Sequence, residues 1–217
     1  MSHGKQFTLY SHKGGPNPWK VVFLLNELGL SYESINAEKN ELKSPEYLKI
    51  NPNGRVPAIV DHKNGDLIVW ESGAILLYMA EKYDVERRYF ATSDADKAPP
   101  AKGTEAPSAA PYFGQAFWFL SHHQEKIPSA IEQYQKEVRR VLGVLESVLS
   151  NHEWLVAGKT TISDISFSTW NVVVDNLLEP GFDFEKEFPA TYSWHQRILV
   201  VPGVKAGFEL KKQLASS

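Results

Sequence analysis

Apolar residues recur over positions 1–83 in short runs that alternate with one longer helical pattern. Phe7–Tyr10 and Tyr32–Ile35 are short apolar runs typical of strands. Between them, Pro18–Leu28 carries apolar residues along one side and is followed by Gly29, a residue that commonly closes a helix. The pattern therefore predicts a strand, a helix and a second strand.

The same region continues with a predicted hairpin. Pro45–Ile50 indicates a short, weak helix, and the runs Val56–Val60 and Leu67–Trp70 indicate two strands joined by a turn at Asn64-Gly65. Ser72 precedes a further apolar-periodic segment, as expected of a helix N-cap. This order of elements is that of a thioredoxin-like unit.

Beyond this unit the composition changes and the pattern becomes helical. Residues 94–111 are rich in alanine and proline, which predicts a loop or mobile segment. Apolar positions at helical spacing follow over Ile131–Leu149, and Ile165–Leu178 is apolar on nearly all sides, as in a buried central helix. Thr161 and Asp164 form a capping box for that helix, so a structural role is expected for Asp164. Pro202-Gly203 precedes a last helix.

These patterns predict an α/β thioredoxin-like N-terminal domain followed by an all-α C-terminal domain. We place the first domain at residues 1–86, a linker at 87–93 and the helical domain at 94–217. Such a length accommodates two domains of ordinary size.

Composition narrows the classes of function. A formal charge of −3 offers no broad basic surface, and 42% hydrophobic residues without a long apolar run indicate a packed protein outside the membrane. With no cysteine, the chain has no disulfide, no thiolate nucleophile and no cysteine-bound metal. We therefore expect no nucleic-acid, membrane or metal partner, and a cytoplasmic location. Any thiol chemistry must use a thiol brought by a ligand.

One feature of the hairpin indicates a binding site. Pro57 lies early in a predicted strand, where it leaves the hydrogen-bonding ladder open. Ser72 then starts a helix, and helix N-termini attract carboxylates. An open strand beside a helix N-terminus is suited to an extended anionic peptide.

Together these segments resemble the glutathione transferase family. Glu71-Ser72 behind the proline-bearing strand is similar to the family's glutathione site, and Leu155–Asp164 is similar to the segment that opens its central C-terminal helix. More narrowly, Tyr10–Val21, Asn51–Ile59 and Tyr112–Phe119 resemble fungal transferases related to the yeast nitrogen-regulator prion protein. The resemblance implies glutathione as co-substrate, a homodimer and a detoxification role.

The resemblance also implies how the thiol is activated. Members of the subgroup use the residue matching Asn17 to stabilise the glutathione thiolate, and we expect this catalytic role here. Asn17 before Pro18 also fits a helix N-cap, which is compatible with that role. Tyr10 and Ser11 are the competing candidates, because many transferases use a hydroxyl near the end of the first strand. We expect Tyr10 to pack on the core instead.

Four further positions are implied to bind glutathione. Val56 would exchange backbone hydrogen bonds with the cysteinyl part, and Pro57 would be cis. Glu71 would meet the γ-glutamyl ammonium, while Ser72 would hold the γ-glutamyl carboxylate; the alternative for Ser72 is a cap alone.

The glycyl end of glutathione is less defined by the sequence. Arg55 either pairs with the glycyl carboxylate or is a solvated cation at the strand end. Relatives often carry a basic or polar side chain near Glu41–Lys43, where Leu42 offers no donor and Lys43 is the available substitute.

The second substrate, a small hydrophobic electrophile or a glutathione conjugate, would need an apolar cleft. The candidates for that cleft are Trp19, Tyr112, Phe113, Phe117, Trp118 and His122. Aromatic residues at such spacing often belong to the core, so we expect only some of them to line it. For the pair His122-His123 we expect a surface or capping role instead of metal binding.

One segment departs from the family. Relatives have a long helix where this chain has the alanine- and proline-rich residues 91–111. Two functions therefore stay open. The first is a transferase that catalyses conjugation, peroxide reduction or deglutathionylation. The second is a non-catalytic protein on the same fold that binds glutathione or a hydrophobic ligand, or that has a regulatory role.

Overall fold

A computed structural model describes residues 4–38, 40–90 and 106–216. The chain divides into two compact units: residues 1–90 together with 200–217, and residues 91–199. The predicted domain limits, 1–86 and 94–217, remain a prediction, but by packing the last helix lies with the first unit.

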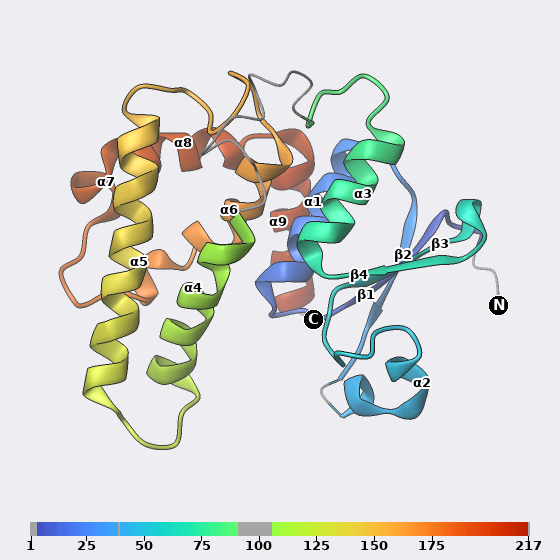
Figure 1. Ribbon diagram of the computed structural model, residues 1–217, viewed down its shortest axis with the longest axis horizontal. Helices are drawn as coiled ribbons and strands as arrows, with labels where there is room; N and C mark the ends of the chain where they lie inside the picture. Colours follow the sequence, from blue (N-terminus) through green and yellow to red (C-terminus); the bar gives the residue numbers. More distant parts are fainter. Residues whose placement is uncertain (1–3, 39, 91–105, 217) are drawn as a thin grey trace. The chain divides into compact units, whose positions relative to one another are not determined.

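The first unit combines a mixed sheet with helices, as the thioredoxin-like prediction requires (Figure 1). Its elements are β1 (Phe7–Ser11), α1 (Pro16–Glu27), β2 (Tyr32–Asn36), η1 (Glu41–Lys43), α2 (Pro45–Leu48), β3 (Ala58–Asp61), η2 (His62–Asn64), β4 (Leu67–Trp70), α3 (Ser72–Tyr83) and α9 (Pro202–Ala215).

The sheet has the strand order β2-β1-β3-β4. β1 pairs in parallel with β2 and antiparallel with β3, and β3 pairs antiparallel with β4. The predicted hairpin is confirmed, with its turn made by Gly65 at φ 65° and Asp66 at φ 56°. At the turn end of the hairpin, buried Asp61 accepts hydrogen bonds from the hydroxyls of Tyr78 and Tyr83, which ties β3 to α3.

Helices α1 and α3 pack together in this unit, and α9 lies along α1 (Figure 1). Phe7 and Leu9 of β1 are fully buried, and α1 buries the run Val21–Leu25. The core of the unit is therefore formed where β1, β3, α1 and α3 bring their apolar sides together.

Among its described residues the second unit has helices joined by irregular segments and no strand. Its elements are α4 (Ala106–Ser121), α5 (Pro128–Leu149), α6 (Ile162–Asn171), η3 (Val174–Asn176), α7 (Phe184–Glu187) and α8 (Pro189–Leu199). The amphipathic pattern of α5 is confirmed, because Val138, Leu142 and Leu145 are buried.

Two predictions in this unit are wrong in detail. Residues 106–111 are not a loop but the first turns of α4, where alanine favours the helix and Pro107 is at the second position, although Pro111 lies inside the helix. Residues 94–105 lie outside the described part. The buried central helix is real, but it ends at Asn171 instead of Leu178. The β-branched run Val172–Val174 disfavours a helix and the chain turns into η3 there.

Asp164 has the structural role that was predicted. The capping box with Thr161 is present, and the fully buried Asp164 carboxylate also accepts hydrogen bonds from the Leu155 amide at 3.1 Å and the Trp194 indole at 2.8 Å. Burial raises the pKa of this carboxyl group, while these hydrogen bonds favour the carboxylate. Asp164 thus joins α6, the segment before it and α8.

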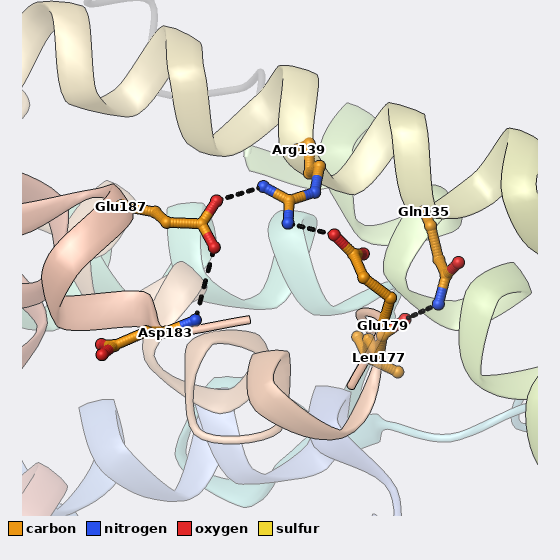
Figure 2. A network of polar contacts seen from close by, with 6 residues as sticks. All are labelled: Gln135, Arg139, Leu177, Glu179, Asp183 and Glu187. Atoms are coloured by element: carbon orange, nitrogen blue, oxygen red, sulfur yellow. Dashed lines mark hydrogen bonds and ion pairs between the residues drawn. The ribbon is translucent and has the colours of Figure 1, made fainter. Parts of the chain in front are cut away.

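A second polar network holds the segment after α6 against α5 (Figure 2). Arg139 forms ion pairs with Glu179 and, at 2.5 Å, with Glu187. Gln135 donates to the Leu177 carbonyl oxygen at 3.0 Å, and the Arg139 guanidinium lies 5.0 Å from the centre of the Phe182 ring. These contacts fix a segment that is otherwise mostly irregular.

None of the described helices is both long enough and apolar enough to span a membrane.

Candidate functional site

Three strand ends meet at one end of the sheet in the first unit. Tyr10 of β1 is paired with Ala58 of β3, and Ala58 is paired with Trp70 of β4. The residues just outside these pairs therefore lie at the same end: the β1–α1 segment, Pro57 before β3 and Glu71 after β4. The sequence predicted all three as parts of one site.

The segment leading into β3 is held by two hydrogen bonds to one backbone oxygen. The Arg55 carbonyl oxygen accepts hydrogen bonds from the Tyr47 hydroxyl and the Asn51 amide, each at 2.7 Å. The Val56–Pro57 peptide bond is cis, as the resemblance implied. Pro57 is buried, whereas Val56 is half-buried and keeps part of its surface accessible.

Arg55 and Lys43 are both exposed near this segment. The Lys43 ammonium donates to the Asn53 carbonyl oxygen at 3.2 Å. Gly54 has φ 60°, and a Cβ there would lie 2.7 Å from the Leu42 carbonyl oxygen, so only glycine fits. Lys43 is therefore placed beside the segment, with its charge directed toward the loop before Arg55.

Glu71 and Ser72 form the start of α3. Glu71, not Ser72, is the N-cap, since the Glu71 carbonyl oxygen accepts the first helical hydrogen bond from Ile75 at 2.9 Å. Ser72 is the first helical residue, and its hydroxyl donates to the Glu71 carboxylate at 3.3 Å. Glu71 has φ 75°, a strained value for a residue other than glycine. The backbone donors of the first helical turn have no partner within the helix itself.

Asn17 belongs to the first turn of α1 but is not its cap. The helix begins at Pro16, with Gly15 as N-cap, so the predicted start at Pro18 is two residues late. Either proline suits a first helical position, and the sequence could not distinguish them. Within the described residues the buried Oδ1 of Asn17 has no hydrogen-bond partner.

Tyr10 packs as predicted, with its ring 5.5 Å from that of Tyr47. Ser11 is buried at the end of β1.

Lys20 is a charged residue near this site that the sequence analysis did not identify. It is only 3% exposed, and burial lowers its pKa to about 8, while the neighbouring Glu71 carboxylate acts in the opposite direction. Lys20 lies three residues after Asn17, on the same side of α1. The available signal was a lone lysine directly before the apolar run Val21–Leu25.

Trp19 is buried inside the first unit, not displayed on a surface. It is 3% exposed, and its indole N–H donates to the Lys13 carbonyl oxygen at 3.0 Å. The Lys211 ammonium lies 5.8 Å from the centre of its ring. These contacts are those of a packed residue, whereas the sequence analysis assigned Trp19 to the substrate cleft.

The other cleft candidates lie on α4 or just after it, in the second unit. Phe113 is fully buried against Trp170, with ring centres 6.0 Å apart, and is a core residue. Phe117 and Trp118 are each 47% exposed, and exposed His122 lies 5.0 and 5.7 Å from their ring centres. Half-buried Tyr112 lies under the guanidinium of Arg140 at 5.7 Å. Of the six residues predicted for the cleft, Phe117, Trp118 and His122 form an exposed aromatic group.

Comparison with known proteins places both units in context. The family model "Glutathione S-transferase, N-terminal domain" matches residues 5–81, and "Glutathione S-transferase, C-terminal domain" matches residues 109–202. Glutathione S-transferase 1 of Schizosaccharomyces pombe is 49% identical over 219 residues, covering 94% of this chain and 96% of that protein.

Two solved structures are similar over nearly the whole chain. Ure2p5 of Phanerochaete chrysosporium, cocrystallised with 1-(S-glutathionyl)-2,4-dinitrobenzene, has a TM-score of 0.90 and 47% identity, covering 100% of this chain and 99% of the other. Ure2p in complex with glutathione has a TM-score of 0.85 and 38% identity, covering 94% and 98% of the two chains.

Proposed function

The chain belongs to the glutathione S-transferase family, in the fungal group related to Ure2p, and we propose that it binds glutathione at the end of the first unit's sheet and transfers it to small electrophiles. The observation that carries this proposal is the register of β1, β3 and β4, which brings the first turn of α1, the cis Pro57 and the Glu71-Ser72 helix start to one end of the sheet.

Both charged groups of the γ-glutamyl part of glutathione would meet the Glu71-Ser72 helix start. Its γ-glutamyl carboxylate would accept a hydrogen bond from the Ser72 backbone N–H, because the first turn of a helix has free donors and a positive potential. The Ser72 hydroxyl would also donate to it after leaving the Glu71 carboxylate. Its γ-glutamyl ammonium would pair with exposed Glu71. The strained backbone of Glu71 supports a functional role for that residue.

The cysteinyl part and the glycyl end of glutathione would lie along the segment before β3. The half-buried backbone of Val56 would exchange hydrogen bonds with the cysteinyl part of glutathione. Arg55 directly precedes Val56, and the Lys43 ammonium donates to the nearby Asn53 carbonyl oxygen. Both side chains are exposed and would attract the glycyl carboxylate. Lys43 would have to leave the Asn53 carbonyl oxygen or share its ammonium with the ligand.

Thiol activation would fall to Asn17 and the α1 N-terminus. A free thiol has a pKa of about 8.5, and lowering it by about two units requires roughly 2.7 kcal/mol of preference for the thiolate. A hydrogen bond to a charged group contributes about 1.5–3 kcal/mol and a helix N-terminus about 0.3–1 kcal/mol. The sum is sufficient. The thiolate would accept this hydrogen bond from the Asn17 Nδ2 amide, because the amide oxygen is an acceptor only.

For the second substrate we propose an aryl halide or a similar small hydrophobic electrophile. The conjugate 1-(S-glutathionyl)-2,4-dinitrobenzene in the related Ure2p5 structure supports this class. The exposed rings of Phe117, Trp118 and His122 would supply apolar contact. We further propose a cytoplasmic homodimer with a role in detoxification, as the family resemblance implies.

The substrate class is tested with a panel of an aryl halide, an isothiocyanate, an alkyl hydroperoxide and a phenacyl-glutathione conjugate. We expect glutathione-dependent turnover of at least one, and the preferred substrate identifies the reaction. Glutathione binding without turnover of any of the four would contradict the transferase proposal and favour a ligand-binding or regulatory protein on the same fold.

A further inference from the structure

The last helix of the chain packs along α1 in a regular register. Glu27, Phe23 and Trp19 are spaced by four residues along α1, and they meet Gly203, Gly207 and Lys211, which have the same spacing along α9. Residues four apart form one ridge of a helix, so the two ridges run antiparallel past each other. Three successive contacts therefore join α1 to α9, from the end of α1 back to its first turn.

The first contact anchors the start of α9. The Gly203 N–H donates to the Glu27 carboxylate, and the Asn26 amide donates to the Gly203 carbonyl oxygen at 3.2 Å. A Cβ at Gly203 would lie 2.7 Å from the Glu27 nitrogen. The Tyr89 hydroxyl also donates to the Glu27 carboxylate and holds it toward α9.

The second contact sets the distance between the helices. A Cβ on Gly207 would overlap the ring of Phe23, so the α9 backbone lies directly against this ring. The Phe208 ring packs beside that of Phe23, with centres 4.8 Å apart.

The third contact lies next to the proposed site. The half-buried Lys211 places its ammonium 5.8 Å from the centre of the Trp19 ring, a cation–π contact that is stronger where water is excluded. The same tryptophan also makes a hydrogen bond, since its indole N–H donates to the Lys13 carbonyl oxygen at 3.0 Å. Lys13 belongs to the segment that joins β1 to α1 and leads directly to Asn17.

We propose that Trp19 is a positioning residue for the glutathione site: held by Lys211 of α9, it fixes the β1–α1 segment through the Lys13 carbonyl and so sets the first turn of α1. This inference rests on the proposed function. It removes Trp19 from the electrophile cleft and assigns the C-terminal helix an effect on glutathione binding without contact to the ligand.

A tryptophan kept for packing alone would not need this arrangement. Phenylalanine would fill most of the same space but cannot donate to Lys13. Methionine would replace the Lys211 stem but not its charge. The two substitutions Trp19→Phe and Lys211→Met thus remove the two specific contacts and retain most of the apolar volume. Lys212→Met, at the exposed neighbouring position of α9, is the matched control.

The test measures glutathione affinity by calorimetry, and the KM values for glutathione and for 1-chloro-2,4-dinitrobenzene by kinetics, in the four proteins. For Trp19→Phe we expect glutathione to bind about tenfold more weakly, the loss of about one hydrogen bond, with the KM for the electrophile unchanged. Lys211→Met should weaken glutathione binding about threefold, the scale of a partly exposed cation–π contact. Lys212→Met should leave both quantities unchanged.

Amide hydrogen exchange of residues 12–17 without ligand gives a readout that does not depend on glutathione. We expect faster exchange there in Trp19→Phe and Lys211→Met, and wild-type exchange in Lys212→Met. A raised KM for the electrophile with normal glutathione binding would overturn the inference, as would lower thermal stability with unchanged affinity and exchange. A wild-type protein that binds no glutathione would instead overturn the proposed function.

Discussion

At the scale of single residues, Lys20 shows how the first unit accommodates a charge in its interior. The side chain is 3% exposed and lies close enough to Glu71 for the two charges to interact. A buried ammonium is costly unless opposite charge or hydrogen bonds compensate. Its position on the same side of α1 as Asn17 adds a positive charge next to the proposed glutathione site.

The lowered pKa of Lys20 makes stability depend on pH in a defined direction. Burial brings the pKa to about 8, against a value of 10.5 for an unperturbed lysine. Between these two values the unfolded chain holds a proton that the folded chain has released, so the free energy of unfolding rises with pH. From pH 8 to pH 9 the contribution is about 1 kcal/mol, below the range in which tyrosines ionise.

Urea unfolding of wild type and Lys20→Met at these two pH values measures this effect. The wild type should gain about 1 kcal/mol more than the variant. Lys82→Met, which removes an exposed lysine of α3, should behave as the wild type. The same pH dependence in wild type and Lys20→Met would contradict a lowered pKa at Lys20.

At the scale of elements, the close approach of α1 and α9 depends on glycine. Gly207 lies against the Phe23 ring, while Gly143, in the middle of α5, has no atom within 4 Å of an added Cβ. The two glycines therefore provide a matched pair in helix interiors.

Alanine at these two positions should have opposite effects on stability. We expect Gly207→Ala to destabilise the protein by about 1–3 kcal/mol, because the added methyl group forces the helices apart. Gly143→Ala should stabilise it by about 0.5–1 kcal/mol through helix propensity alone. Chemical denaturation of the two variants checks both values, and a stabilising Gly207→Ala would contradict the close packing of α9 on α1.

Sequence patterns predicted the elements well where the signals are local. The hairpin from Val56 to Trp70 was recognisable because its turn residues and apolar runs are adjacent in the chain. Helix starts were displaced by one or two residues at Glu71 and Gly15, since these residues cap through their backbone and have no typical cap side chain. The end of α6 was missed because the apolar pattern continues beyond Asn171 although the helix does not.

At the scale of the whole molecule, the two units were predictable as fold types but their membership was not. The α9 helix follows the helical unit in sequence yet packs against α1 of the first unit. Its amphipathic pattern predicts that one face is buried but does not say against which element. Trp19 is also covered by this long-range packing, since Lys211 of α9 lies over its ring. Pro57 and Ser72, by contrast, could be proposed from the pattern because each lies next to a strand or helix end that the pattern marks, whereas Val56 and Glu71 were proposed from the family resemblance.

The central claim is that Asn17 stabilises the thiolate of bound glutathione. Asn17→Ala removes the amide, and Asn17→Asp replaces it with a carboxylate of the same shape that repels a thiolate. An acidic residue in the first turn favours the helix, so Asn17→Asp should be at least as stable as the wild type. Stability and thiol activation are thereby expected to change in different directions.

The most direct measurement is the pKa of the bound glutathione thiol, followed through the ultraviolet absorbance of the thiolate as a function of pH at saturating protein. For the wild type we expect a pKa about two units below that of the free thiol. It should rise by about one to two units in Asn17→Ala, the equivalent of one hydrogen bond to a charged group, and further in Asn17→Asp. A bound thiol with the same low pKa in all three proteins would contradict the account.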